Sequence, residues 1–257
     1  MKKKLGIFCV SLEKDIKRRE ILSLNFKNYY NDFNTVYAVD GRKLSAKEYF
    51  EKSFLTTINL KNRLMTPSEL GCTLSHIEAL SQFLKSEFDF ALILEDDVIG
   101  SDESIEKVKN QIQNLKENTI LICGGQNGLN DKYLYGKKIN DLFLIPKFSY
   151  SSIFRTCCYL VDKKAANWIL DYQKKYHNLA DRWDMILKNS HANLYFIDIF
   201  SHPVDLENSH IESERNIISN SSFLKKRNLL KNATIKIYKI FSTFYLKILK
   251  YEKINAK

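Results

Sequence analysis

The sequence lacks long hydrophobic runs, internal repeats and low-complexity linkers. No segment has the roughly 18 consecutive apolar residues that a membrane-spanning helix requires, which argues against an integral membrane protein. The apolar run at residues 5–10 is short and leads into charged residues, so it indicates a first β-strand rather than a signal peptide. With 257 residues, 44% of them hydrophobic, the chain is long enough for one sizeable α/β domain with an appendage.

Cysteine is scarce and irregularly placed. The five cysteines are Cys9, Cys72, Cys123, Cys157 and Cys158. Their odd number and the lack of a CxxC pair argue against both a disulfide framework and a zinc site. Most of them lie in apolar segments, which predicts buried free thiols in a reducing compartment and therefore a cytoplasmic protein.

An apolar run leads directly into three adjacent carboxylates. Residues 91–94 read Ala-Leu-Ile-Leu, and Glu95, Asp96 and Asp97 follow. A strand that ends in acids places them at a sheet edge, where α/β proteins bind ligands. Carboxylates this close repel one another, and their oxygens suit Mg²⁺ or Mn²⁺ shared with a phosphate. This pattern predicts metal-assisted handling of a diphosphate, and the alternative is a solvated acidic turn.

A helix start precedes that strand. Thr66 supplies a capping hydroxyl, Pro67 suits the first turn, and Glu69 places an acid at the positive end of the helix. Apolar residues then recur at helical spacing to about residue 85. The small Gly71 predicts close packing of this helix against another backbone. His76, taken alone, is typical of a structural histidine.

Strand and helix patterns alternate along the chain. Strands are expected at residues 5–12, 34–39, 88–94, 119–123, 156–161 and 194–199, and helices at 13–29, 46–54, 67–85, 102–117, 163–175 and 181–189. This alternation predicts a mainly parallel sheet with helices on both faces. Residues 124–150 contain four glycines and are expected to form a loop, with a mobile flap as one interpretation.

Five collinear stretches share one pattern. They are Val10-Ser11-Leu12 with Arg18-Arg19, AVDG at 38–41, PSELGCTLSH at 67–76, ALILEDDV at 91–98, and CYLV at 158–161 followed by KAA at 164–166. In order and spacing they resemble glycosyltransferase family 25, the lipooligosaccharide galactosyltransferase family that also includes collagen galactosyltransferases. Ser11 stands where this family usually has asparagine, and Ser68 where it has glycine. The resemblance covers about residues 5–212.

The resemblance implies a GT-A-type single α/β domain and an inverting transfer from a nucleotide sugar, most often UDP-galactose. It implies Mn²⁺ or Mg²⁺ as cofactor and a lipooligosaccharide or other lipid-linked glycan of bacterial type as acceptor. In the resembling fold the last acid of the motif binds the ion, which makes Asp97 the expected metal ligand. Asp96 is expected to support the metal site or bind the ribose, and Glu95 to act as a supporting acid.

Further residues of these motifs are expected to contact the donor. They are Ser11, Arg18, Arg19, Asp40, Glu69 and His76. Arg18 and Arg19 would meet the uracil or the diphosphate, or else lie on a solvated helix face. Asp40 would contact the nucleoside. His76 either lies near the donor or makes a hydrogen bond in the core.

The general base is expected in the segment Asp181-Arg182-Trp183-Asp184. Asp181 falls where the resembling family has an aspartate, and Asp184 is the second candidate. Trp183 would stack on an acceptor sugar or lie in the core. Since many GT-A enzymes complete the metal shell with a late histidine, His210 is the expected second ligand, ahead of His202.

The basic charge is concentrated at the C-terminus. The chain carries a net charge of +10, and residues 222–257 have ten basic groups against one acid, Glu252. From Leu230 to Tyr251, apolar residues recur at three and four positions with lysines opposite, which predicts a basic amphipathic helix. Residues 1–220 are thus expected to form the transferase domain and 221–257 a tail. The tail either binds an anionic membrane surface or packs on the body or a second subunit, and no motif favours nucleic acid.

Two other functions fit the same elements. A nucleotidyltransferase also uses paired acids and metal in an α/β fold, but the loop after Leu12 lacks the glycines that such enzymes usually have there. A non-catalytic module that binds a glycan or a partner would tolerate replacement of Asp97 and Asp181. The sequence favours a metal-dependent glycosyltransferase over both, with a peripheral position on the cytoplasmic membrane.

Overall fold

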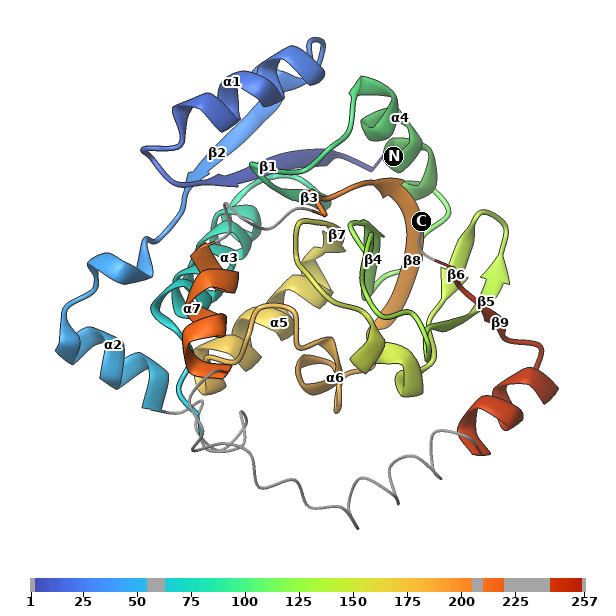
Figure 1. The fold of residues 1–257 in the computed structure, drawn as a ribbon. Helices are drawn as coiled ribbons and strands as arrows, with labels where there is room; N and C mark the ends of the chain where they lie inside the picture. The colour runs from blue at the N-terminus through green and yellow to red at the C-terminus, as the bar shows by residue number, and fades with distance from the viewer. Residues whose placement is uncertain (1–2, 55–62, 205–209, 220–240, 256–257) are drawn as a thin grey trace.

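The computed structural model describes residues 3–54, 63–204, 210–219 and 241–255 (Figure 1). The strands in chain order are β1 (Leu5–Ser11), β2 (Phe33–Tyr37), β3 (Phe90–Glu95), β4 (Thr119–Gly124), β5 (Tyr135–Ile139), β6 (Leu142–Leu144), β7 (Cys158–Asp162), β8 (Asn193–Phe200) and β9 (Glu252–Lys253). The α-helices are α1 (Ile16–Asn25), α2 (Ala46–Ser53), α3 (Pro67–Lys85), α4 (Asp102–Ile112), α5 (Lys163–Tyr176), α6 (Trp183–Ile186) and α7 (His210–Ser219). Short 3₁₀ turns are η1 (Tyr30–Asp32), η2 (Gly41–Lys43) and η4 (Lys147–Ser152).

The described strands form one mixed sheet in the order β2-β1-β3-β7-β4-β8-β6-β5-β9. β1 pairs in parallel with β2 and β3, and β4 with β8, whereas β7 lies antiparallel between β3 and β4. β6, β5 and β9 continue the sheet in antiparallel pairs. Most of these strands run in one direction, but most neighbouring pairs are antiparallel, so the sheet is mixed rather than mainly parallel as predicted. The reversed β7 was not predicted, because a buried apolar run carries no sign of its direction.

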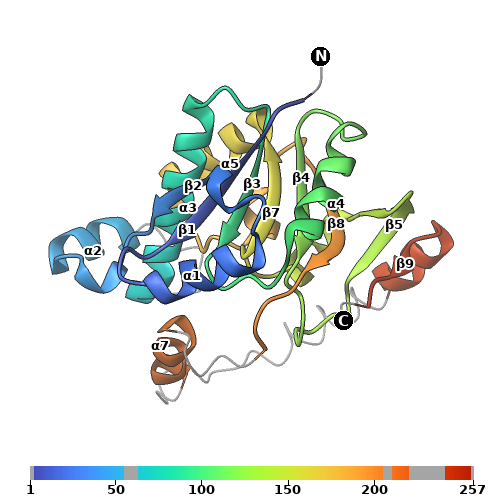
Figure 2. The same ribbon diagram turned by 90° about the horizontal axis from the view of Figure 1, so that it is seen from above.

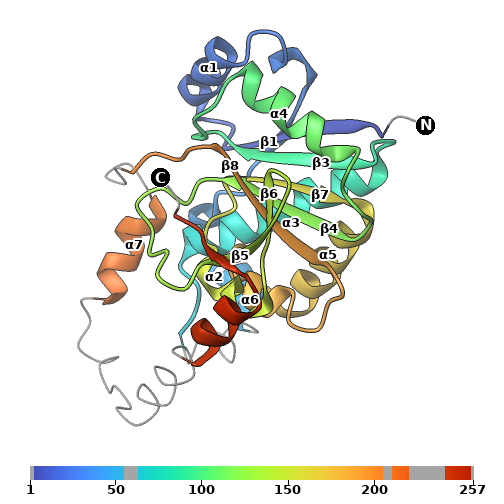
Figure 3. The ribbon, with the colours of Figure 1, turned by 90° about the vertical axis from the view of Figure 1, so that its right-hand side faces the viewer.

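Strand alternation divides the core into two layers. Phe8, Val10 and Ile93 pack toward α3 and α5, while Ile7 and Leu92 pack toward α1 and α4. Figure 3 shows α1 and α4 above the sheet and α5 and α6 below it. The sheet is thus covered on both faces, which confirms the predicted α/β class.

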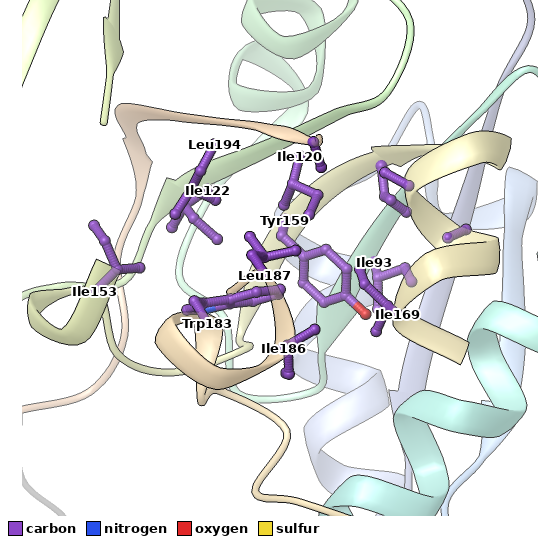
Figure 4. Packing of buried hydrophobic residues seen from close by; sticks show 14 of the residues in the cluster. Ile93, Ile120, Ile122, Ile153, Tyr159, Ile169, Trp183, Ile186, Leu187 and Leu194 are labelled. Carbon is purple, nitrogen blue, oxygen red and sulfur yellow. The ribbon is translucent and has the colours of Figure 1, made fainter. Parts of the chain in front are cut away.

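The lower layer closes around a pair of large aromatic side chains. The rings of Tyr159 and Trp183 meet edge to face with centroids 5.6 Å apart, and both side chains are buried (Figure 4). Trp183 is therefore a core residue, and the interpretation that it stacks on a sugar is wrong.

Two of the sequence-based expectations about loops and helices are wrong. Residues 124–150 are not one loop, because they include β5, β6 and part of η4. The C-terminal helix does not continue to Tyr251, because the chain turns at Leu249 and Lys250 and then adds β9 to β5. Residues 230–240 of that predicted helix lie outside the described residues. The helical residues 241–248 lie beside β5 in Figures 1 and 2.

The N-terminus of α3 is fixed by its cap and by a close backbone contact. The Thr66 hydroxyl accepts the Glu69 N–H, and the Glu69 carboxylate accepts the Thr66 N–H, as the predicted capping pattern requires. A Cβ on Gly71 would lie 2.6 Å from the Val39 carbonyl oxygen and 2.7 Å from the Gly41 nitrogen. This contact holds the loop that carries Asp40 against α3.

We predict that Gly71→Ala destabilises the protein by about 1–3 kcal/mol, although alanine is the better helix former. The added methyl would meet two backbone atoms that cannot rotate away. Urea unfolding measures the change. The control is Glu78→Ala, an exposed position on the same helix, which is expected to change stability by less than about 0.5 kcal/mol. A Gly71→Ala variant as stable as the parent would contradict the close contact.

Candidate functional site

A cavity of about 670 Å³, here called the central cavity, lies where β1 and β3 end and α3 begins. The expected site residues that line it are Ser11, Arg18, Asp40, Glu69, His76, Glu95, Asp96, Asp97 and Asp181. Residues more than 160 positions apart in sequence thus share one cavity. The carboxyl ends of parallel strands are where α/β folds bind ligands.

Glu95 lies on the α3 side of the sheet and is held by two donors. The Thr156 hydroxyl donates to Glu95 Oε1 over 2.7 Å, and His76 Nε2 lies 3.2 Å from the same oxygen. His76 Nδ1 contacts the Tyr159 hydroxyl at 3.2 Å. Burial disfavours the charge of Glu95, but the hydrogen bonds and charge of His76 and the Thr156 hydroxyl outweigh it, so the pKa of Glu95 lies below its ordinary value.

Asp96 lies on the opposite side, toward α1. Arg18 donates to Asp96 Oδ1 over 2.9 Å and also reaches Asp97 Oδ2 at 3.4 Å. Burial raises the pKa of Asp96, and the hydrogen bonds from Arg18 and Ser11 oppose that rise. One arginine from the first helix therefore neutralises part of the charge of two adjacent acids.

Asp97 is the least satisfied of the three acids. Its Oδ1 is buried and has no hydrogen-bond partner among the described residues. The nearest candidate is His202 Nε2, 3.6 Å away. Burial first, and then repulsion from Glu95, raise the pKa of Asp97 to about 6.

The tautomer of His202 explains this gap. Its Nδ1 lies 2.8 Å from the Pro203 carbonyl oxygen, which can only accept, so Nδ1 carries the proton. In the neutral ring Nε2 then presents a lone pair toward the carboxylate oxygen Asp97 Oδ1. Two acceptors facing each other need a proton on one of them or a metal ion between them. An oxygen and an imidazole nitrogen are suitable ligands for Mn²⁺, so these residues fit the expected ion.

A short backbone bridge brings His202 to this position. Ile99 and Ser201 exchange two N–H···O hydrogen bonds of 2.9 Å, which join the segment after Asp97 to the end of β8. The expected ligand His210 is the first residue of α7, and its side chain lies outside the described residues. The structure thus places His202, the less favoured histidine of the sequence, against Asp97.

The two candidate bases have different surroundings. Asp181 lines the central cavity, and its Oδ2 accepts the Arg155 N–H over 3.1 Å. Asp184 does not line the cavity and instead forms a two-pronged ion pair with Arg182, at 2.8 and 2.9 Å. The structure therefore places Asp181 at the site and Asp184 away from it, contrary to the expectation that included both.

Three of the residues expected to contact the nucleotide-sugar donor are instead bonded to other residues of the protein. Arg19 does not line the cavity and instead donates to the Ser11 hydroxyl and to the Leu12 and Glu13 carbonyls. Asp40 lines the cavity but is paired with Arg42 at 2.7 Å. The Asp40 pKa is held below its ordinary value chiefly by that arginine.

Glu69 is the third of these residues. Arg63 and Arg215 bind its carboxylate, each at 2.7 Å. Burial disfavours the charge of Glu69, but these arginines and the Thr66 N–H outweigh it and lower its pKa. Glu69 therefore holds Arg215 of α7 at the cavity wall.

Three further residues line the cavity although their sequence context did not predict it: Arg155, Thr156 and Arg215. Arg155 has a φ of 65°, a strained value for a non-glycine residue that is typical of functional sites. Its guanidinium donates to the Gly125 and Asn127 carbonyls. Its sequence neighbours give no signal of this conformation, because the contacts of Arg155 are with Gly125 and Asn127, which are far away along the chain.

Residues 4–187 match the model of glycosyltransferase family 25 (LPS biosynthesis protein). Two curated relatives, each called a glycosyltransferase 25 family member, are from Drosophila melanogaster and Aedes aegypti. The first is 28% identical over 125 residues, which is 46% of this chain and 20% of the relative. The second is 26% identical over 219 residues, which is 77% of this chain and 34% of the relative.

The chain belongs to glycosyltransferase family 25, and the resemblance seen in its motifs is confirmed. The chain spans about a third or less of the length of the two insect relatives. The mixed sheet with helices on both faces confirms the predicted single α/β domain.

Two solved structures that partly match this chain are mannose-1-phosphate geranyltransferase from Thermus thermophilus and residues 1–349 of TarS from S. aureus. The first has a TM-score of 0.42 and 10% identity over 78% of this chain and 75% of the other. The second has a TM-score of 0.39 and 15% identity over 76% of this chain and 60% of the other. Among the described residues, no helix combines the length and the apolar character that crossing a bilayer demands.

We predict that Asp97→Asn stabilises the metal-free protein at pH 7 by about 1–3 kcal/mol. The Asp97 carboxyl has a pKa of about 6 in the folded protein and 3.8 in the unfolded chain. It therefore lowers the free energy of unfolding as the pH rises between these two values, and this loss of stability remains at higher pH. Asparagine removes the penalty. Thermal unfolding with a chelator at pH 7 and at about pH 4 measures the effect, which is expected to vanish at the lower pH.

The matched control is Asp171→Asn, an exposed aspartate on α5 for which the gain is expected to be absent at both pH values. Destabilisation by Asp97→Asn at pH 7 would show instead that Arg18 and His202 already stabilise the charge of Asp97.

Proposed function

We propose that this chain is an inverting, metal-dependent glycosyltransferase that uses a UDP-sugar, with UDP-galactose as the first choice. The observation that carries the proposal is the buried Asp97 Oδ1, which has no hydrogen-bond partner among the described residues and lies 3.6 Å from His202 Nε2 in the central cavity. Family membership supports the reaction class. The choice of galactose and of a lipid-linked acceptor, such as a lipooligosaccharide, follows from the family resemblance.

Asp97 and His202 are the residues that would hold Mn²⁺ or Mg²⁺. When bound, the ion would stabilise the negative charge that develops on the departing diphosphate. Arg18 lies beside Asp96 and Asp97 at the cavity wall and can also meet a phosphate oxygen. Arg155 brings a second guanidinium to the wall, bound only to backbone carbonyls in the described contacts.

Asp181 is the proposed general base. The Arg155 N–H fixes its Oδ2, and its Oδ1 would accept the proton of the acceptor hydroxyl. As that proton leaves, the hydroxyl oxygen forms a bond to the anomeric carbon, and the bond from this carbon to the diphosphate oxygen breaks. A single displacement of this kind inverts the anomeric centre. Glu95 already accepts from His76 and Thr156, so it is better placed to order the site.

We predict that the purified protein releases UDP from one member of a UDP-sugar panel when Mn²⁺ is present. Asp97→Asn and Asp181→Asn are each expected to slow release by about a hundredfold or more. Asp181→Asn should still bind UDP with metal, whereas Asp97→Asn should not. Rates come from UDP release, and binding comes from calorimetry.

Asp184→Asn is the matched control, because it makes the same change three residues from Asp181 but outside the cavity. Its rate is expected to stay within a few-fold of the parent rate. Metal-dependent UDP-sugar binding without any release would support a binding module instead. Release that is insensitive to chelator would refute metal dependence.

We further propose that the C-terminal helix holds the protein on an anionic membrane surface, near a lipid-linked acceptor. Leu246 packs on the body, so the helix turns another side to solvent. The exposed side chains there are Phe241, Phe244, Tyr245, Ile248 and Leu249, with exposed fractions of 69%, 65%, 60%, 62% and 43%. Lys247 and Lys250 are exposed beside them. Apolar rings flanked by lysines suit an interface with anionic lipid.

Phe244→Ser is predicted to reduce binding to vesicles that contain an anionic phospholipid, because an exposed aromatic ring no longer enters the interface. Co-sedimentation measures binding, which should be weaker with zwitterionic vesicles and at high salt. The control is Leu24→Ser, an equally exposed apolar residue on α1. Equal binding by both variants, or no preference for anionic vesicles, would contradict this surface.

A further inference from the structure

A second group of metal-ligand side chains lies in the wall of the central cavity. One ligand atom each from Cys72, His76 and Glu95 lies within 4.8 Å of the other two. Cys72 and His76 are four residues apart on α3, so they share one face of the helix. Glu95 reaches them from the end of β3. All three line the cavity, so an ion can reach them from solvent.

The donor set differs from that of the Asp97–His202 pair. A thiolate sulfur, an imidazole nitrogen and a carboxylate oxygen are the three ligand types of Zn²⁺ in proteins. Mg²⁺ and Mn²⁺ prefer oxygen, so a sulfur ligand selects against them. The Asp97–His202 pair offers no sulfur. The Cys72 sulfur therefore makes the second group selective against Mg²⁺ and Mn²⁺, which the Asp97–His202 pair is not.

The hydrogen bonds of His76 allow it to act with or without an ion. Without one, His76 Nε2 donates to the Glu95 carboxylate, and Nδ1 of the neutral ring can accept from the Tyr159 hydroxyl. A hydroxyl can also accept, so the ring can instead donate from Nδ1 to Tyr159 and offer the Nε2 lone pair to a metal. The hydrogen bond to Tyr159 would then hold the His76 ring in the orientation that a metal ligand needs. Glu95 keeps its hydrogen bond from Thr156 in either state.

We propose that Cys72, His76 and Glu95 form a zinc-binding site, and that zinc bound there inhibits the enzyme. The inhibitory part rests on the proposed transferase function. Binding replaces the Cys72 S–H bond with a sulfur–zinc bond and releases one proton to solvent, with no change of oxidation state. Three protein ligands leave a coordination position of Zn²⁺ that water or substrate can fill, and here it would face the cavity. Zinc binding would also replace the hydrogen bond between His76 and Glu95, two residues from Asp97.

Cobalt is the probe for the site, because Co²⁺ bound to a thiolate absorbs in the near ultraviolet. The metal-free protein is expected to show this charge-transfer band at one Co²⁺ per thiolate site, and added Zn²⁺ should abolish the band. Cys72→Ser should lose it, while Asp97→Asn and His202→Asn should keep it. Circular dichroism and unfolding midpoints of the variants confirm that they fold. A missing band in the parent, or a band that persists in Cys72→Ser, would overturn the site.

Inhibition is measured separately, as UDP release at saturating Mn²⁺ with increasing Zn²⁺. Cys72→Ser is expected to raise the half-inhibiting Zn²⁺ concentration by at least about tenfold, since even groups that only support a ligand contribute that much to metal affinity. Equal inhibition of both proteins would place the effect of zinc elsewhere and refute the inhibitory site. The cobalt band does not depend on turnover, so failure of the transferase proposal would leave the test of the site intact.

Discussion

Three carboxylates follow one another at the end of a buried strand, and the surroundings of the cavity serve to neutralise them. The alternation of β3 separates them: Glu95 continues the face of Ile93 toward α3, and Asp96 continues the face of Leu92 and Leu94 toward α1. Each side then supplies its own partner, His76 from α3 and Arg18 from α1. Asp97 follows the strand, where neither helix satisfies its Oδ1. Without this separation the charges would repel one another at close range in a poorly solvated place.

The same requirement explains why distant segments meet here. The Ile99–Ser201 bridge ties the chain after the acids to the end of β8 and so delivers His202. The Gly41 and Gly71 backbones touch, which brings the Asp40 loop to the cavity. Glu69 caps α3 and binds Arg215 with the same carboxylate, so the cap of one helix also positions another. Local helix chemistry and assembly of the cavity are therefore coupled through single residues.

Local signals in the sequence were sufficient for the features that depend on neighbours in the chain. The capping pattern at Thr66 and the bounds of α3 were predicted, because both follow from the order of residues within a few turns. Strand direction and pairing were not, as β7 and β9 show, since they depend on contacts across the sheet. His202 was ranked below His210 for the same reason. Spacing along the chain does not reveal that Ile99 and Ser201, which are far apart in sequence, form a backbone bridge.

Acids in the cavity differ less in type than in what already occupies their oxygens. Arginines bind Glu69, Asp96 and Asp40. These carboxylates order the site, because a ligand would have to displace strong internal partners. Asp97 and Asp181 differ: one has an oxygen without a partner, and the other is held by a single backbone N–H in the described contacts. Unused lone pairs, rather than negative charge, therefore identify where an ion and a proton would bind. That criterion requires coordinates, since the sequence shows every acid alike.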